Sequence, residues 1–219
     1  MPAPRQPKIY HILHVDRLAS VLACGELLSD AQVIANRLPG TMIGMSSIKR
    51  RRLEHNFLES HPGLKVGECV PFYFCPRSVM LYLIYQGNHE ELTYRGGQGK
   101  IIHLECDLYE AVNWARQFNR RWAFTLSNAG SFYFEDRANL SCLDEVNWTA
   151  VAANRWSGPG VDTSIKEGKQ AEFLMEGSFP WQLVERVGVP SLALYHHVSG
   201  LLSENSHRPR LEILNEWYY

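Results

Sequence analysis

Cysteine is scarce in this chain, and the placement of its cysteines excludes several kinds of site. The five cysteines are scattered through 219 residues, and no two of them form a CxxC pair. An odd, scattered set argues against a disulfide framework and a zinc knuckle, and it indicates reduced thiols in a cytoplasm. The sequence also lacks an apolar run long enough to cross a membrane, and its first residues lack the apolar segment of a secretory signal. We therefore expect a cytoplasmic protein without a membrane partner.

The chain has no excess of either charge. Its formal net charge of −1 neither requires nor excludes a nucleic-acid partner, because local patches matter more than the total. Basic side chains do gather locally, at 49–52, at 120–121 and at 208–210. A composition of 45% hydrophobic and 21% charged residues, without repeats or low-complexity segments, is typical of a globular protein. We expect one domain that spans residues 1–219.

Short predicted strands alternate with predicted helices along the chain. Alternating and apolar runs predict strands at 9–13, 70–74, 100–105, 122–125, 171–175, 180–184, 186–189 and 210–215. Apolar residues at helical spacing predict helices within 16–28, 46–58, 78–85, 107–118 and 190–202. The rest of 29–68 reads as long loops, and 131–168 as helix mixed with a loop rich in glycine and proline. Strands separated by helices indicate the α+β class, with a split β-sheet.

Glu172 stands alone among apolar residues in the predicted strand 171–175. Strand alternation puts Glu172 and Leu174 on one face and the three other residues on the opposite face. Because burial of an unpaired carboxylate is costly, a chain rarely places one there without a reason. Two interpretations stay open at this point. Glu172 lies on the solvent face of an edge strand, or it is a catalytic carboxylate at the end of a strand.

Four further features carry groups that suit a binding site. His11 and His14 lie near the end of the first strand, but no third ligand at metal spacing accompanies them, so we expect no metal. The guanidinium groups of 50–52, in a predicted helix, can bind a diphosphate in bidentate fashion. Residues 70–78 form an aromatic strand with two prolines, typical either of a core or of a pocket that stacks rings. Residues 124–129 run from a strand into a small polar turn, where side chains often face a substrate.

These features occur together in one known family. The chain resembles the DarT family, DNA ADP-ribosyltransferase toxins of bacterial toxin–antitoxin systems. Residues 9–18 (IYHILHVDRL) resemble the family's opening IYHITHIDNL, and residues 70–82 (VPFYFCPRSVMLY) resemble its VPFYFCPRSPMLY. Residues 96–104 (GGQGKIIHL) are similar to its GGQ followed by ILHL, and residues 169–174 (KQAEFL) to its KQAEFLV. With a similar C-terminal end at 217–219, the resemblance covers nearly all of the chain.

The resemblance implies the ADP-ribosyltransferase fold, a split β-sheet with an NAD cleft between its halves and helices around it. It implies NAD⁺ as co-substrate, no metal, and transfer of ADP-ribose to a DNA base. Glu172 matches the catalytic general base. Arg51 and Arg52 match the arginine pair that holds the diphosphate and the nicotinamide end, with their register open by one residue, and Arg17 replaces the usual asparagine. The other cofactor-binding residues carried over in this way are His11, Ile12, Leu13 and Tyr73.

The acceptor that the resemblance implies is single-stranded DNA, because a paired base nitrogen cannot attack the ribose carbon without extrusion. Asn128 and the loop 155–169 are the expected substrate-binding region, with Arg155 to contact phosphate and Trp156 to stack on a base. Thymine-modifying members carry aspartate and histidine where this chain has Leu126 and Asn128. The modified base therefore stays open between guanine and thymine, and Asn128, which offers both a donor and an acceptor, favours guanine.

The family also implies a partner, an antitoxin of the DarG kind with a macrodomain that removes ADP-ribose, in a bacterial cytoplasm. Three other functions stay open. The fold can serve as a nucleotide-binding or nucleic-acid-binding module, or as an NAD-dependent RNA-modifying transferase such as the tRNA 2′-phosphotransferase. A ribonuclease with His11 and His14 as an acid–base pair is the third. The presence of Glu172 together with His11 and the arginines favours the DNA transferase.

Overall fold

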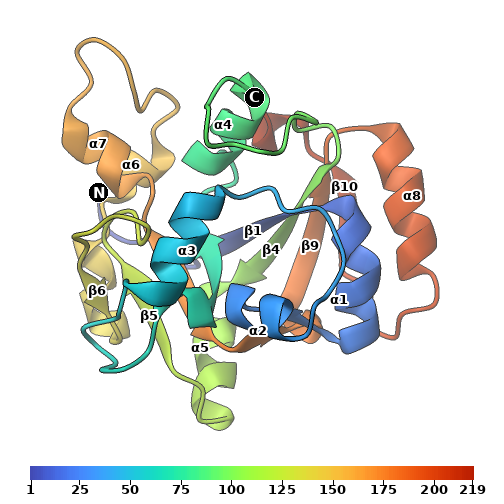
Figure 1. Cartoon of the computed structure of the whole chain (residues 1–219), viewed down its shortest axis with the longest axis horizontal. Helices are drawn as coiled ribbons and strands as arrows, with labels where there is room; N and C mark the ends of the chain where they lie inside the picture. The colour runs from blue at the N-terminus through green and yellow to red at the C-terminus, as the bar shows by residue number, and fades with distance from the viewer.

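The computed structural model describes all residues, 1–219, and confirms the α+β class (Figure 1). One sheet has the strand order β10-β9-β4-β1-β3-β7-β5-β6, and β2 pairs separately with β8. The strands are β1 (Lys8–His14), β2 (Glu26–Leu28), β3 (Cys69–Tyr73), β4 (Ile101–Asp107), β5 (Trp122–Thr125), β6 (Asp136–Arg137), β7 (Glu172–Glu176), β8 (Ser178–Pro180), β9 (Val184–Val189) and β10 (Arg210–Ile213). The helices are α1 (Leu18–Cys24), α2 (Asp30–Ala35), α3 (Ser46–Glu54), α4 (Val79–Gln86), α5 (Leu108–Gln117), α6 (Trp148–Ala152), α7 (Thr163–Gly168) and α8 (Leu192–Leu202). None of these helices has the length and apolar character needed to cross a membrane.

The sheet is split between β1 and β3. Strand β1 pairs with β4 along its whole length, from Lys8↔Asp107 to His14↔Ile101. Its register with β3 contains a single pair, Tyr10↔Tyr73. The two strands therefore diverge, and they divide the sheet into the halves β10-β9-β4-β1 and β3-β7-β5-β6. In Figure 1, α2 and α3 lie in front of this part of the sheet.

Strand β7 lies inside the sheet and is buried on both faces, as a near-continuous apolar run requires. Phe173 belongs to the main hydrophobic core, where it packs on Phe72 of β3 with ring centroids 6.2 Å apart. Leu174 points the other way, into a second cluster that contains Leu58 and Leu64. The predicted alternation along β7 is confirmed, and each such side chain contributes roughly 1.5–3 kcal/mol through its burial.

Local capping residues begin and end the helices where the sequence predicted them. The Ser78 hydroxyl accepts a hydrogen bond from the Leu81 N–H and begins α4, while the Asp107 carboxylate caps α5. Gly25 takes a left-handed conformation, with φ 73°, and ends α1.

Predictions for four segments of secondary structure are wrong. Residues 26–28, the end of a segment expected to be helical, form β2, and residues 136–137, expected to be helix or loop, form β6. Residues 180–184 were expected to form a strand, but Trp181–Leu183 form a 3₁₀ helix between β8 and β9. The Trp181 indole N–H donates to the carbonyl of His207 at 3.1 Å, which anchors this turn in the core. Helix α2 was expected to be loop, although Ser29 caps it by accepting from the Gln32 N–H. Its six residues carry too short an apolar pattern to identify a helix.

Candidate active site

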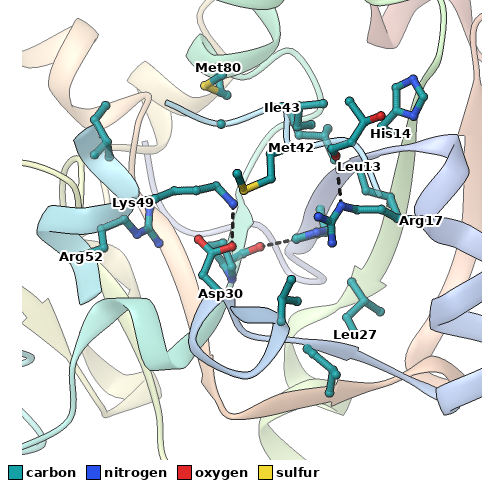
Figure 2. A pocket seen from close by; sticks show the side chains of 18 of the residues that line it. Leu13, His14, Arg17, Leu27, Asp30, Met42, Ile43, Lys49, Arg52 and Met80 are labelled. Atoms are coloured by element: carbon teal, nitrogen blue, oxygen red, sulfur yellow. Dashed lines mark hydrogen bonds and ion pairs between the residues drawn. The ribbon is translucent and has the colours of Figure 1, made fainter. Parts of the chain in front are cut away.

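A pocket opens where β1 and β3 diverge, and it contains most of the predicted site residues (Figure 2). Strands β1, β3 and β7 provide His11, Ile12, Leu13, Tyr73 and Glu172. Helices α1 to α4, strand β2, the segment 38–45, Asn128 and Gln170 provide the remaining walls. The charged side chains in these walls are Arg17, Glu26, Asp30, Lys49 and Arg52. The split of the sheet thus creates a pocket with a small number of charged groups inside it, as binding sites for small molecules commonly have.

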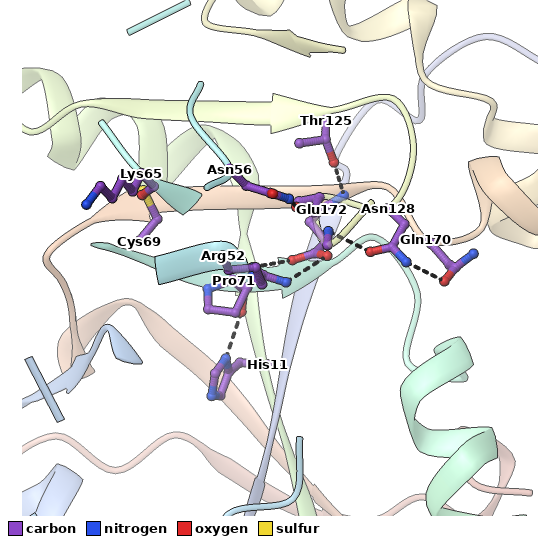
Figure 3. A network of polar contacts seen from close by, with 12 residues as sticks. His11, Arg52, Asn56, Lys65, Cys69, Pro71, Thr125, Asn128, Gln170 and Glu172 are labelled. Carbon is purple, nitrogen blue, oxygen red and sulfur yellow. Dashed lines mark hydrogen bonds and ion pairs between the residues drawn. The ribbon is translucent and has the colours of Figure 1, made fainter. Parts of the chain in front are cut away.

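The central feature of the pocket is an ion pair between Glu172 and Arg52 (Figure 3). The two carboxylate oxygens accept from Nη1 and Nη2 of Arg52 at 3.1 and 2.9 Å. The side chain of Glu172 is only 3% exposed, so the interpretation that it lies on a solvent face is wrong. Burial alone would lower the pKa of Arg52, but the charge of Glu172 and its hydrogen bonds with Arg52 together outweigh burial and raise that pKa above its ordinary value. Arg52 therefore stays charged, and its two hydrogen bonds fix the orientation of the Glu172 carboxylate in the pocket.

The backbone around Glu172 holds this carboxylate in place. Its N–H donates to Oγ1 of Thr125 on β5 at 3.0 Å, and the Thr125 hydroxyl donates in turn to the carbonyl of Ser127 at 2.7 Å. On its other side, Glu172 lies opposite Tyr73 in the β3–β7 register. Burial, followed by the negative charge of Glu172, raises the pKa of Tyr73 well above its ordinary value. Tyr73 consequently keeps its phenol proton and remains a hydrogen-bond donor in the pocket.

His11 presents one ring nitrogen to the pocket in a defined protonation state. Its Nδ1 lies 2.7 Å from the carbonyl oxygen of Pro71 (Figure 3). Since a carbonyl only accepts, Nδ1 carries the proton, and Nε2 of the neutral ring offers a lone pair. Burial lowers the pKa of His11, which favours this neutral ring. His11 is therefore an acceptor suited to a sugar hydroxyl.

Arg51 and Arg52, the predicted arginine pair, contact different partners. Arg51 does not line the pocket. Its Nη1 donates to the carbonyl of Gly130 at 2.8 Å, and its guanidinium carbon lies 4.2 Å from the ring centroid of Phe132. Adjacent residues of a helix face different directions, so Arg51 points away from the pocket here, and its role in binding the cofactor stays a prediction. Only Arg52 turns toward Glu172.

Further charged residues line the pocket without having been identified from the sequence as site residues, among them Lys49, Asp30 and Arg17. Lys49 of α3 donates to Asp30 of α2 at 2.6 Å, across the opening seen in Figure 2. Asp30 lies in the helix that was expected to be loop, so the sequence contained no sign of this contact. Arg17 donates to the backbone carbonyls of Gly40 and Thr41 and ties the segment 38–45 to the beginning of α1. Its replacement of the family's asparagine was the only sequence signal for this contact.

Asn128 lines the pocket together with Arg52 and Glu172, and its role near the acceptor stays a prediction. Its Nδ2 donates to Oε1 of Gln170 at 3.1 Å, and its Oδ1 accepts from the N–H of Gly130 at 2.8 Å. One donor and one acceptor position of the amide are thus used within the protein. This weakens the argument from Asn128 for guanine, and it adds Gln170, which the sequence reasoning missed, to the pocket wall.

Trp156 and Arg155, the second half of the predicted substrate-binding region, lie outside the pocket lining. Trp156 is buried, with its indole N–H donating to the hydroxyl of Tyr219 at 3.2 Å and its ring edge against Tyr82. It therefore has no free face on which a base can stack. Arg155 is exposed and donates to the carbonyl of Pro159 at 2.7 Å within its own loop.

Comparisons with known proteins agree with this geometry. The model of a family described as "ssDNA thymidine ADP-ribosyltransferase, DarT" matches residues 10–219. A DNA ADP-ribosyl transferase of Thermus sp. (strain 2.9) is 36% identical over 223 aligned residues, which cover 99% of this chain and 98% of the relative. The solved structure of Thermus sp. 2.9 DarT in complex with ADP-ribosylated ssDNA superposes with a TM-score of 0.86 at 33% identity, and each chain is covered completely. The same Thermus protein in complex with NAD⁺ gives a TM-score of 0.81 at 32% identity over 99% of both chains.

Proposed function

The chain belongs to the DarT family, and we infer from this that it is a DNA ADP-ribosyltransferase with NAD⁺ as co-substrate and single-stranded DNA as acceptor. The observation that carries this inference is the buried bidentate pair of Glu172 and Arg52 in the pocket at the split of the sheet. The complexes of the Thermus relative with NAD⁺ and with ADP-ribosylated ssDNA support both substrates. We propose that residues 1–219 act as one catalytic unit.

Different pocket residues bind NAD⁺ and stabilise the charge that develops on its ribose. Nε2 of His11 accepts from a hydroxyl of the ribose next to nicotinamide, and the protonated phenol of Tyr73 donates to the same end of NAD⁺. The bond between nicotinamide and C1′ breaks with positive charge developing on the ribose, as in glycoside cleavage. The Glu172 carboxylate, oriented by Arg52, stabilises that charge.

Glu172 also acts as the general base for the acceptor. A base nitrogen forms the new bond to C1′ and loses its proton to Glu172, nicotinamide leaves with the electrons of the broken bond, and the proton then passes to solvent. Each NAD⁺ thus yields one ADP-ribosyl base, one nicotinamide and one proton. Arg52 is a positioning residue in this step, since it acts through the carboxylate that it holds.

We propose thymidine as the modified nucleoside. The family description names thymidine. The amide of Asn128 already donates to Gln170 and accepts from the N–H of Gly130 within the protein. The sequence argument for guanine rested on that amide. Guanine remains the alternative outcome of the test.

The cellular setting belongs to the same proposal. A DNA adduct of this kind is toxic unless it is reversed, so we propose a role as the toxin of a toxin–antitoxin pair, in a bacterial cytoplasm. Its partner would be an antitoxin with a macrodomain that removes ADP-ribose. The five free cysteines agree with a reducing compartment.

The test is incubation with NAD⁺ and a set of matched oligonucleotides, followed by mass spectrometry. Single-stranded DNA with thymidine as its only reactive base should gain one ADP-ribosyl group, whereas the duplex, the RNA of the same sequence and a guanine-only strand should not. Labelling of RNA alone would favour the RNA-modifying transferase. Cleavage of RNA without NAD⁺ would favour a ribonuclease, and binding without consumption of NAD⁺ would favour a binding module.

A further inference from the structure

Two consecutive aromatic side chains project into solvent beside the pocket. Phe132 is 73% exposed and Tyr133 is 92% exposed, in the loop that joins β5 to β6. Exposed apolar side chains are unremarkable when they occur singly, but neighbouring aromatic rings form a patch that usually has a partner. The burial of Trp156 leaves these two rings as an alternative surface for stacking.

The backbone of this loop is held firmly against α3. Asn56 donates through Nδ2 to the carbonyls of Ala129 and Ser131 at 2.7 and 2.8 Å, and Arg51 donates to the carbonyl of Gly130 between them. A Cβ at Gly130 would lie 2.7 Å from the side chain of Ile48, so this close approach requires glycine. The two rings are therefore presented from a fixed backbone, which reduces the entropy lost when a ligand stacks on them.

A cation lies against the first of the two rings. The guanidinium carbon of Arg51 lies 4.2 Å from the centroid of Phe132. Arg52 directs its charge to a carboxylate, whereas Arg51 directs its hydrogen bond to a neutral carbonyl and keeps its charge available. An aromatic face next to a cation combines the two elements by which proteins bind single-stranded nucleic acid, base stacking and attraction of the phosphate backbone.

The same loop also lines the pocket that contains Glu172. Asn128, four residues before Phe132, lines the pocket and bonds to Gln170, which lies two residues before Glu172. This loop is therefore one of the surfaces that border a strand whose target base lies at Glu172.

We propose that Phe132, Tyr133 and Arg51 form a stacking platform for the nucleotide next to the modified base of single-stranded DNA. This inference rests on the proposed function and names how the acceptor strand is held. It gives Arg51, which the sequence had suggested for NAD⁺, a place in DNA binding. Because every base has a π face, such a platform selects for unpaired strands without reading their sequence.

The experiment compares Phe132→Ala and Tyr133→Ala with a matched control, Phe118→Ala. Phe118 is 54% exposed and stacks on Trp114 near the end of α5, outside the pocket lining. Fluorescence anisotropy measures the Kd for a labelled thymidine oligonucleotide, and calorimetry measures the Kd for NAD⁺. We expect each platform variant to raise the Kd for DNA by about 5- to 150-fold, which corresponds to the loss of stacking on one base. The Kd for NAD⁺ should not change. The Tyr133→Phe variant keeps an aromatic ring and should bind DNA with the Kd of the wild type. The control variant, Phe118→Ala, should also bind DNA with the Kd of the wild type.

A second series of oligonucleotides carries an abasic nucleotide on one side or the other of the target thymidine. Together with the protein variants, these oligonucleotides complete a double-mutant cycle. If the platform stacks a neighbouring base, an abasic neighbour should weaken the wild type and leave the Phe132→Ala variant unchanged. Equal affinities of variants and wild type for the intact oligonucleotide would overturn the proposal, as would a variant that changes only self-association in light scattering. If the wild type binds DNA more tightly than the platform variants but transfers no ADP-ribose to it, the platform is supported and the proposed chemistry is rejected.

Discussion

Replacement of Glu172 by glutamine removes one charge from the pocket and keeps the size of the side chain. In the native protein both carboxylate oxygens accept from Arg52. An amide offers one oxygen only, and its NH₂ group would meet a guanidinium N–H, donor against donor. Loss of the general base should lower turnover by about 10²–10⁴-fold. The Kd for NAD⁺ should change little, because the carboxylate acts on charge that develops in the transition state.

The same substitution has a consequence for stability that must be separated from catalysis. Arg52 is buried, with a side chain 11% exposed, and it would keep a charge without a partner. Removal of one partner of a buried ion pair costs at most about 3–5 kcal/mol, and glutamine retains one hydrogen bond, so the loss should fall below that range. Urea unfolding measures it. The double variant Arg52→Met with Glu172→Leu should recover stability, because it buries no lone charge, while turnover stays absent.

Glu176 provides the matched control on the same strand. It also forms an ion pair with an arginine, Arg121, but it does not line the pocket. Glu176→Gln should keep full turnover and lose about 0–1 kcal/mol, as is typical of partly exposed pairs. Turnover of oligonucleotide is followed by mass spectrometry at saturating NAD⁺, with circular dichroism as the test of folding. A folded Glu172→Gln protein with more than about one tenth of wild-type turnover would refute the assignment of the general base.

Three other predictions follow from single residues. Arg52→Lys keeps the charge but loses the bidentate contact with Glu172, so kcat should fall by about tenfold or more, and an unchanged kcat would show that orientation is unimportant. Burial lowers the pKa of His103 to about 4 from 6.5, so the unfolded chain binds its proton first as the pH falls. The wild type should therefore lose about 3 kcal/mol of unfolding free energy between these two pH values, and urea titrations of His103→Gln should lack that loss. Cys24 is exposed and lines the pocket, so saturating NAD⁺ should slow its alkylation by iodoacetamide, whereas Cys69, whose pKa burial raises to about 12, should react only after unfolding.

The elements that the sequence predicted well are those set by local pattern. Strand β5 occupies the predicted residues 122–125, and α5 begins directly after the capping residue Asp107. The split itself was expected from the order of strands and helices and from the family resemblance, but its position in the sheet was not. It depends on the single pair Tyr10↔Tyr73 joining two distant segments, and no local propensity encodes which distant strands pair.

The site shows the same division between local and distant information. Alternation along β7 identified the face on which Glu172 lies, and the apolar neighbours indicated burial. The partner that makes this burial tolerable lies 120 residues earlier in the chain, on α3. Lys49 and Asp30 meet because α2 forms, and a helix of six residues has too little periodicity to be read. Trp156 was assigned to a base because it lies in a loop, while the structure buries it through contacts with the far C-terminus.

The arginine run shows what helix geometry alone could have decided. Residues 46–58 were expected to be helical, and α3 does contain Arg51 and Arg52. Successive residues of an α-helix are about 100° apart around its axis, so two adjacent side chains seldom converge on one diphosphate. One arginine had to turn away from any shared ligand, and the two contacts show which: Arg52 meets Glu172 and Arg51 meets the loop at Gly130. Because the two arginines are adjacent in the sequence, they suggested a shared diphosphate site. Because they are adjacent in a helix, they contact different parts of the protein.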